Sequence, residues 1–388
     1  MFWKLQENVI NDSHLDLLIS FIKETKRFTQ FTKVAEFENE FAKWQGCRYC
    51  VYVNSGSSAN LLLLNTAKEY YGWENGDEII VPTVTWPTTV TPVMQCGLKP
   101  VFVDVNLSDL SLDYDKVKLS ITSKTKAIFV AHLLGFPADI ERLRDVIAGR
   151  DILILEDCCE SQGANINGIK VGNFGVAGTF SFYWGHHMTT VEGGMLCTND
   201  EELYKLFLLK RSHGLAREMP AENHARLKET YKGIDFNFLF LTDGFNVRNT
   251  EFNAVLGLTQ MACIDEFILK RNNNYMTFLS ICKEYQNELL LLDVPGISSF
   301  VLPFLFKNVE KKQKFQEIIR TAGIESRPLI SGNLLRQPFL NKYYNETDCP
   351  NADFIHDHAF YIGNNQFVDE NRLNKLALLM KEFFRGCK

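Results

Sequence analysis

The strongest chemical signal in this sequence is a polar loop that carries two adjacent histidines. Residues 178–184 are rich in aromatic and β-prone side chains and predict a strand. The chain then breaks at a glycine, presents His186 and His187, and reaches a Glu-Gly-Gly turn at residues 192–194. An imidazole in such a loop can move protons near neutral pH, or it can be an ordinary packed or solvated side chain.

A carboxylate marks the end of another expected strand. Residues 151–157 form an apolar run that ends in acid, which is typical of a parallel strand covered on both faces. Ligands of such sheets bind beyond the carboxyl ends of the strands, so we expect Asp157 at a ligand site. Taken alone, Asp157 could equally cap a helix that follows the strand.

A serine-rich turn follows a further short strand. Residues 50–53 predict the strand, and residues 54–60 turn into a helix that extends to about Tyr70. Gly56 permits a tight turn, and the free N–H groups at the helix start, around Ser57, can hold an anion. On its own the pattern equally fits an ordinary strand–turn–helix joint capped by serines.

These segments together resemble one known family. Residues 181–194 resemble the cofactor-lysine segment of the DegT/DnrJ/EryC1/StrS sugar aminotransferases, fold-type I enzymes that use pyridoxal phosphate (PLP). The resemblance covers nearly the whole chain and implies an α/β fold whose mostly parallel central sheet is flanked by helices. It places a large cofactor-binding domain at residues 1–260 and a smaller α+β domain at residues 261–388. It rests on five segments in the right order, which are residues 55–60, 86, 157–161, 181–194 and 244–251.

The chain departs from the family at the residue that holds the cofactor. The family lysine would stand at His186, and no lysine occurs between Lys170 and Lys205. Imidazole cannot bind PLP covalently, but it can transfer protons. The resemblance therefore implies non-covalent pyridoxamine phosphate (PMP) and His186 as the catalytic base, as in the branch of nucleotide-sugar 3-dehydratases.

Such an enzyme removes the C3 hydroxyl of a nucleotide-linked 4-keto-6-deoxy sugar, and L-glutamate then restores PMP. The products of this branch are 3,6-dideoxy sugars of lipopolysaccharide O-antigens. GDP as the nucleotide is implied by the resemblance alone. The sequence leaves open whether His187 assists His186.

The resemblance also assigns roles to residues around the cofactor. Trp86 would stack on the pyridine ring, and Asp157 would pair with the ring nitrogen. Asn246 would reach the cofactor phosphate of a neighbouring subunit, which implies a homodimer with shared active sites. The residues implied to bind the cofactor are Gly56, Ser57, Trp86, Asp157, Glu160, Ser181 and Asn246. Those implied to bind substrate or glutamate are Arg248, Arg327, Arg336 and His213, although Arg327 and Arg336 could equally form surface ion pairs.

Three alternatives remain. The chain could be a nucleotide-sugar aminotransferase in which another lysine serves, or a cofactor-binding regulator without catalysis. It could also be a CDP-sugar 3-dehydratase that uses an iron–sulfur cluster, but that branch carries a Cys-x-Cys pair, which this sequence lacks. The isolated pair Cys47-x-x-Cys50 is only a weak indication of metal or redox chemistry, so no metal site is expected.

Composition narrows the functional class further. The chain has 388 residues, enough for more than one domain, and a formal net charge of -6 without any basic run. A nucleic-acid partner is therefore not expected. The N-terminal residues do not form a signal peptide, and the apolar runs are too short to span a bilayer. We expect a cytoplasmic protein.

A few local expectations can be compared directly with the structure. Helical spacing predicts a helix over residues 13–26, with Ser13 as its N-cap. A single helix over 252–285 would contain the domain boundary. Residues 218–241 are expected to form a loop or flap over a site. His132, in an apolar strand, is expected to be a core histidine with satisfied hydrogen bonds.

Overall fold

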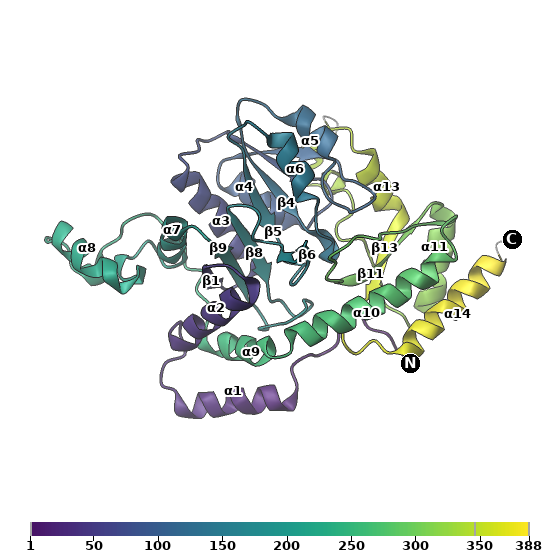
Figure 1. The fold of residues 1–388 in the computed structure, drawn as a ribbon, viewed down its shortest axis with the longest axis horizontal. Coiled ribbons are helices and arrows are strands. Elements are labelled where there is room, and N and C mark those ends of the chain that lie inside the picture. The colour runs from purple at the N-terminus through teal and green to yellow at the C-terminus, as the bar shows by residue number, and fades with distance from the viewer. Residues whose placement is uncertain (1, 345–346, 387–388) are drawn as a thin grey trace.

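A seven-stranded sheet forms the centre of the protein (Figure 1). The computed structural model describes residues 2–344 and 347–386. The strand order is β1-β9-β8-β5-β4-β2-β3, in which β8, β5, β4, β2 and β3 run parallel and β9 is antiparallel to both of its neighbours. The expected mostly parallel sheet is therefore confirmed. Its strands are β1 Tyr49–Val53, β2 Glu78–Pro82, β3 Lys99–Val103, β4 Thr125–Ala131, β5 Leu153–Asp157, β8 Ala177–Ser181 and β9 Gly194–Thr198.

Helices cover both faces of this sheet. Alternate residues of each strand point to opposite faces, and on each face they pack with the helices into a separate apolar core. On β4, Phe129 joins the core built with α3, α4 and α7, whereas Ile128 and Val130 join the core built with α5 and α6. Helices α2 and α9 cover the part of the sheet that contains β1, β8 and β9. These helices are α2 Thr32–Gln45, α3 Gly56–Tyr70, α4 Pro87–Gln95, α5 Tyr114–Ser120, α6 Ile140–Ile147, α7 Glu201–Arg211 and α9 Glu251–Met261.

A smaller α+β unit follows, with an antiparallel sheet of order β10-β11-β13-β12 (Figure 1). The N-terminal segment packs onto this unit, since Trp3 pairs with Ile324 and its indole N–H donates to the carbonyl of Gly363 at 3.0 Å. The elements are α10 Ile264–Lys283, β10 Leu289–Leu290, β11 Val301–Phe306, α11 Val309–Thr321, β12 Ser326–Pro328, α12 Asn341–Tyr344, α13 Pro350–His358, β13 Ala359–Gly363 and α14 Glu370–Gly386.

Two local predictions about helices need correction. The helix expected over 252–285 is two helices, because the chain bends by 62° between α9 and α10. The first helix, α1 (Asp12–Glu24), is capped by Asn11 rather than by Ser13, since the Asn11 side chain accepts the backbone N–H of His14 at 3.0 Å. Among the described residues no single helix is long and apolar enough to cross a membrane, and only the bent α9–α10 pair passes that test.

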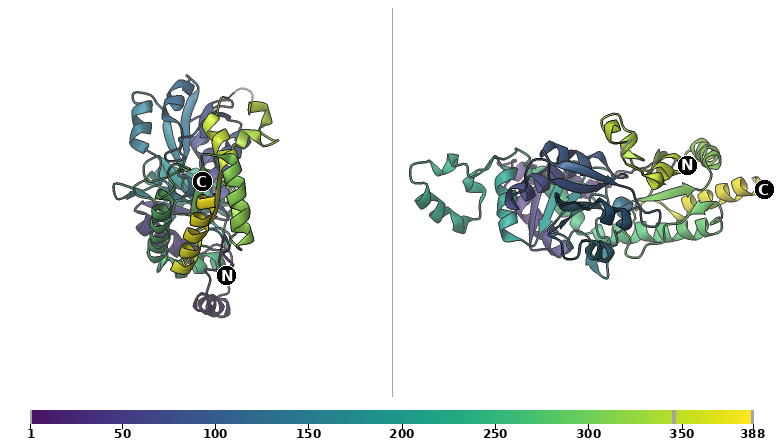
Figure 2. Two further views of the ribbon diagram at one scale, coloured as in Figure 1. Left: turned by 90° about the vertical axis from the view of Figure 1, so that its right-hand side faces the viewer. Right: turned by 90° about the horizontal axis from the view of Figure 1, so that it is seen from above.

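Residues 214–245 form an arm that projects away from the body of the molecule and carries α8 (His224–Thr230) at its far end (Figures 1 and 2). The arm has a small apolar cluster of its own, built around Ala216, Leu227 and Leu239. The prediction of a flap over residues 218–241 is therefore wrong for the cavity of the same chain, which this segment does not line.

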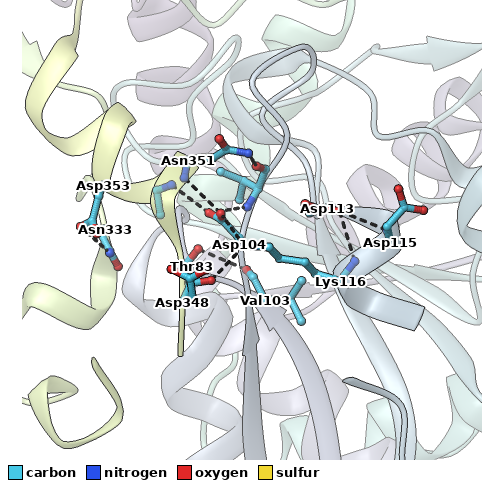
Figure 3. A network of polar contacts seen from close by, with 12 residues as sticks. Thr83, Val103, Asp104, Asp113, Asp115, Lys116, Asn333, Asp348, Asn351 and Asp353 are labelled. Carbon is cyan, nitrogen blue, oxygen red and sulfur yellow. Dashed lines mark hydrogen bonds and ion pairs between the residues drawn. The ribbon is translucent and has the colours of Figure 1, made fainter. Parts of the chain in front are cut away.

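A buried carboxylate joins the two units (Figure 3). Asp104, which follows β3 and is fully buried, accepts the backbone N–H groups of Asn351 and Ala352 at 3.1 and 2.8 Å. These N–H groups open helix α13, where an anion is favoured by the helix dipole. Lys116 lies 3.2 Å from the same carboxylate. The network thus fixes α13 to the edge of the large sheet.

Replacing Asp104 with alanine should lower the free energy of unfolding by about 2–4 kcal/mol, because buried donors lose a charged acceptor. Denaturant titration at a fixed protein concentration measures this loss. The matched control is Asp115→Ala, since Asp115 is exposed and pairs only at the surface with Arg142. Equal effects of the two substitutions would contradict the assigned role of Asp104.

Candidate active site

A cavity of about 530 Å³ lies beyond the carboxyl ends of β4, β5 and β8. This is the edge at which parallel sheets bind ligands. Its walls come from the loops after those strands, from the histidine loop at 182–193, and from the smaller α+β unit. Eight residues that were predicted at the site line the cavity together: Gly56, Ser57, Trp86, Asp157, Glu160, Ser181, His186 and Arg327.

The start of α3 forms an anion cradle on the cavity wall. Ser55 caps the helix by accepting the N–H of Ser58 at 3.0 Å, which leaves the N–H groups of Gly56 and Ser57 without an intrahelical acceptor. A methyl group at Gly56 would lie 2.7 Å from Cβ of Ser181. Only glycine therefore lets the helix start approach Ser181, whose hydroxyl lies at the end of β8.

The last glycine of the Glu-Gly-Gly turn, Gly194, is required by steric crowding of the same kind. A methyl group at Gly194 would lie 2.2 Å from the carbonyl oxygen of Ser55. A glycine at this position allows β9 to pass against the backbone of the cradle, which fixes the histidine loop beside it.

Asp157 is held firmly at the cavity by hydrogen bonds from three elements. Its Oδ2 accepts Nδ2 of Asn60 and Oγ1 of Thr89, both at 2.8 Å. Its Oδ1 accepts the backbone N–H of Cys159 at 3.1 Å. Helices α3 and α4, together with the turn after β5, thus fix the orientation of this carboxylate.

His186 enters the cavity from the histidine loop. Its ring stacks on Phe300 with the centroids 5.2 Å apart, and Nδ1 is buried with no hydrogen-bond partner among the described residues. Nε2 is thus the nitrogen that can serve the cavity. Burial, together with the positive charge of Arg271, lowers the pKa of His186 well below its usual value, so the imidazole is a neutral base near neutral pH.

His187 points away from that chemistry. It is fully buried, and its Nε2 lies 3.2 Å from the carbonyl oxygen and 3.1 Å from the hydroxyl of Ser298. It does not line the cavity. His187 therefore ties the loop to the segment before β11, whereas His186 is presented to the cavity.

Arg271 of α10 binds the backbone of the histidine loop. It is fully buried, and its guanidinium donates to the carbonyl oxygens of His186, Phe300 and Asn364 at 3.2, 3.1 and 2.5 Å. Sequence reasoning did not identify Arg271, because an arginine within an amphipathic helix usually faces solvent.

Replacing Arg271 with methionine should move the acidic limb of the pH profile of kcat/KM to higher pH. Removal of the positive charge makes protonation of His186 easier, so its pKa rises and the neutral base is lost at a higher pH. Lysine at position 271 retains the charge and is the matched control. The pH dependence of both variants tests this, and coincident limbs for the methionine variant and the native enzyme would contradict it.

Glu160 is a second acid–base group on the cavity wall. Burial, reinforced by the charge of Asp157, raises the pKa of Glu160 to about 7, although its carboxylate accepts the N–H of Leu134 at 2.9 Å. Nearby, His132 bonds Glu156 at 3.0 Å and accepts the N–H of Ala138. His132 is thus satisfied as predicted, although it also touches the cavity.

The two predicted arginines of the smaller unit have different environments. Arg327 of β12 is exposed at the cavity beside Tyr361, its partner on β13. Arg336 instead forms ion pairs with Asp353 and Asp357 of α13 and does not line the cavity. Arg336 thus forms the ion pairs that were the alternative prediction for both arginines, whereas Arg327 is placed to contact a ligand in the cavity.

Besides Arg336, three further predicted residues lie outside the cavity of their own chain, and they are His213, Asn246 and Arg248. Asn246 is exposed and pairs with Ser212, whose hydroxyl accepts a hydrogen bond from Arg248 at 3.2 Å. His213, in a left-handed backbone conformation, lies next to them. Their shared location on one surface is compatible with a role in the site of a second subunit.

Sequence reasoning missed several residues that line the cavity. They include the exposed ring of Tyr183, the phenol of Tyr361, and Leu5 and Gln6 from the N-terminal segment. Gln6 donates to the carbonyl of Gly185 at 2.6 Å. Such contacts join distant parts of the chain and leave no local pattern. Only Tyr183, within the histidine segment, could have been found from its position.

Comparison with known proteins agrees with this geometry. Residues 12–376 match the DegT/DnrJ/EryC1/StrS aminotransferase family. The chain is 35% identical to GDP-4-keto-6-deoxy-D-mannose 3-dehydratase of Yersinia pseudotuberculosis over 371 residues, which cover 93% of this chain and 94% of the relative.

Two solved structures of that enzyme are also similar. One is the Escherichia coli enzyme with bound hydrated PLP, with a TM-score of 0.89, 33% identity, and coverage of 98% of this chain and 99% of the other. The second holds a trapped PLP-glutamate geminal diamine and has the same TM-score and identity, with coverage of 97% and 99%.

Proposed function

This chain belongs to the DegT/DnrJ/EryC1/StrS aminotransferase family, and we propose that it is a PMP-dependent nucleotide-sugar 3-dehydratase. It removes the C3 hydroxyl of GDP-4-keto-6-deoxy-D-mannose to give the 4-keto-3,6-dideoxy sugar, and L-glutamate regenerates PMP. One observation carries the proposal. His186 lines the cavity beside Asp157, and none of the described residues that line this cavity is a lysine.

The residues present fit a pyridoxal-type cofactor. Gly56 and Ser57 offer free N–H groups to a phosphate, and the close approach of Ser181 leaves no room for a side chain at position 56. Trp86 is 57% exposed in the cavity and offers an aromatic face. Asp157 offers a fixed carboxylate to a ring nitrogen.

When bound, PMP supplies an amine that condenses with the C4 ketone and a ring that accepts electron density. The negative charge of Asp157 would stabilise a positive charge on that ring. His186 Nε2 can take up a proton from the bound reactants, since the imidazole is neutral near pH 7. The same nitrogen can return the proton to the C3 hydroxyl as it leaves as water, so that one group acts first as base and then as acid.

The remaining cavity residues suit the substrate. Arg327 can bind a diphosphate through its guanidinium. Glu160, with a pKa of about 7, can accept a hydrogen bond from a sugar hydroxyl or donate one to it. In a homodimer with shared sites, Asn246 would bind the cofactor phosphate of the partner subunit and Arg248 the carboxylate of glutamate. Asn246 is exposed, Arg248 is half-buried, and their shared location on one surface supports this assignment.

The first test is spectroscopic. The purified protein loaded with PLP should yield no lysine adduct after borohydride treatment, because no described lysine lines the cavity. L-glutamate should convert the PLP absorbance band to that of PMP, with one 2-oxoglutarate released per cofactor. A borohydride-trapped lysine peptide, identified by mass spectrometry, would instead identify an aminotransferase.

The second part of the test follows the substrate. The PMP form should release ammonia and the 4-keto-3,6-dideoxy product from GDP-4-keto-6-deoxy-D-mannose, and the CDP- and dTDP-linked 4-keto-6-deoxy sugars are the matched controls. Turnover of a CDP-sugar only in the presence of a reductase would overturn the proposal in favour of the iron–sulfur alternative.

A further inference from the structure

A cluster of three thiols lies away from the active site. Cys47 precedes β1, Cys50 lies on β1, and Cys197 lies on β9. The sulfur of Cys50 is 3.5 Å from that of Cys47 and 3.2 Å from that of Cys197, and all three sulfurs lie within 4.8 Å of one another. The Cys-x-x-Cys pair thus gains a third thiol through the pairing of two strands.

Strand register explains why the third thiol is in place. Cys50 and Cys197 are direct partners in the antiparallel pair of β1 and β9, so their side chains leave the same face of the sheet. Both are buried in the apolar core under α2, whereas Cys47 is only partly buried and gives access from solvent. Two rigid strands and a turn therefore hold the three sulfurs together.

The sulfur positions suit a small soft metal ion. A zinc–sulfur bond of about 2.3 Å places tetrahedral sulfur ligands about 3.8 Å apart. The separations from the sulfur of Cys50 to those of Cys47 and Cys197, 3.5 and 3.2 Å, are smaller than this, so a bound ion would push these sulfurs slightly apart. Thiolates select Zn²⁺ and Cu⁺ over harder ions. No fourth His, Cys, Asp or Glu among the described residues joins the group, which is one ligand short of a Cys₄ set.

We propose that Cys47, Cys50 and Cys197 bind one thiophilic d¹⁰ metal ion, Zn²⁺ or Cu⁺, in a structural site separate from the catalytic cavity. Three sulfurs complete a trigonal Cu⁺ site, whereas Zn²⁺ would take a water as its fourth ligand.

The site lies on the strands that carry the catalytic turn. The partners Val53 and Gly194 end the β1–β9 pair at the cradle, three residues from Cys50 and Cys197. Three residues of strand correspond to about 10 Å. None of the three cysteines lines the catalytic cavity. A bound ion would therefore fasten edge strand β1 to β9 without touching the reactants.

The test uses the reduced full-length PMP form under anaerobic conditions. Co²⁺, as a probe for the Zn²⁺ arm, should bind with one equivalent per chain, showing thiolate charge-transfer bands and ligand-field bands of a tetrahedral site. The Cu⁺ arm measures transfer from a colorimetric Cu⁺ chelator. Zn²⁺ should displace Co²⁺ and protect the three cysteines from alkylation, while the PMP spectrum stays unchanged.

Matched variants separate this site from other thiols. Cys47→Ser and Cys197→Ser should each abolish the stoichiometric binding, whereas Cys282→Ser, in the other main core, should leave it intact. Cys47 is partly exposed, so Cys47→Ser should fold. It therefore tests the loss of metal binding even if Cys197→Ser does not fold. The proposal is overturned if no ion binds, if binding survives both cluster substitutions, or if the protein instead forms a Cys50–Cys197 disulfide that takes no ion.

Discussion

Replacing His186 with asparagine should lower kcat for dehydration by about 10²–10⁴-fold, the usual contribution of a general acid–base group. Asparagine cannot accept a proton near neutral pH, and His186 provides the neutral imidazole that faces the cavity from the loop after β8. KM should change much less, because the His186 ring packs against Phe300 and is not expected to hold the substrate through an ion pair. Steady-state ammonia release measures both constants.

The neighbouring histidine is the informative control. His187→Asn should lower the free energy of unfolding, by about 1–3 kcal/mol, because the contacts with Ser298 are lost in a fully buried position. Its kcat in the folded protein should stay well above that of His186→Asn. Comparable losses of kcat in the two variants would show that the loop as a whole, and not the imidazole of His186, is required.

Replacing Asp157 with asparagine should lower kcat by about 10²–10³-fold, the typical cost of removing one fixed electrostatic group from an active site. The amide oxygen can still accept Asn60 and Thr89, so the geometry of the site is largely kept while the negative charge is lost. Single-turnover reaction of the PMP form with the sugar substrate measures the chemical step directly.

Two measurements keep this prediction specific. The cofactor content of Asp157→Asn, determined after denaturation, separates weak cofactor binding from slow chemistry. Asp151→Asn, an exposed residue just before β5, is the matched control at the opposite end of the same strand. Full single-turnover activity of Asp157→Asn with bound PMP would refute an electrostatic role for Asp157.

The candidate catalytic residues could be predicted from the sequence where they follow one another along the chain. The apolar run before Asp157 predicted β5 and its end at the cavity, and the structure confirms that position. The loop with His186 was found because a strand, two histidines and a glycine turn follow one another. Its flanking glycine could be explained only in three dimensions, since Gly194 is required by the backbone of Ser55.

Residues brought in by tertiary packing could not be predicted. Arg271 lies in a long helix of mixed polarity, and nothing in that pattern indicates a fully buried guanidinium under the histidine loop. Cys197 gives no signal by itself, because its partnership with Cys50 depends on the register of β9 against β1. Asn11 and Ser13 are both good caps, so the start of α1 was uncertain by two residues.

The placement of the N-terminal segment affects how the protein is made. Trp3 and Gly363 are 360 positions apart yet share a hydrogen bond, and Leu5 donates to Glu325. Trp3 and Leu5 are therefore synthesised more than 300 residues before the partners that they contact. The central sheet can form during synthesis, but Leu5 reaches its place in the cavity wall only after Glu325 has been made. Contacts of such long range are slow to form, so a newly made chain should acquire its substrate pocket as a late step.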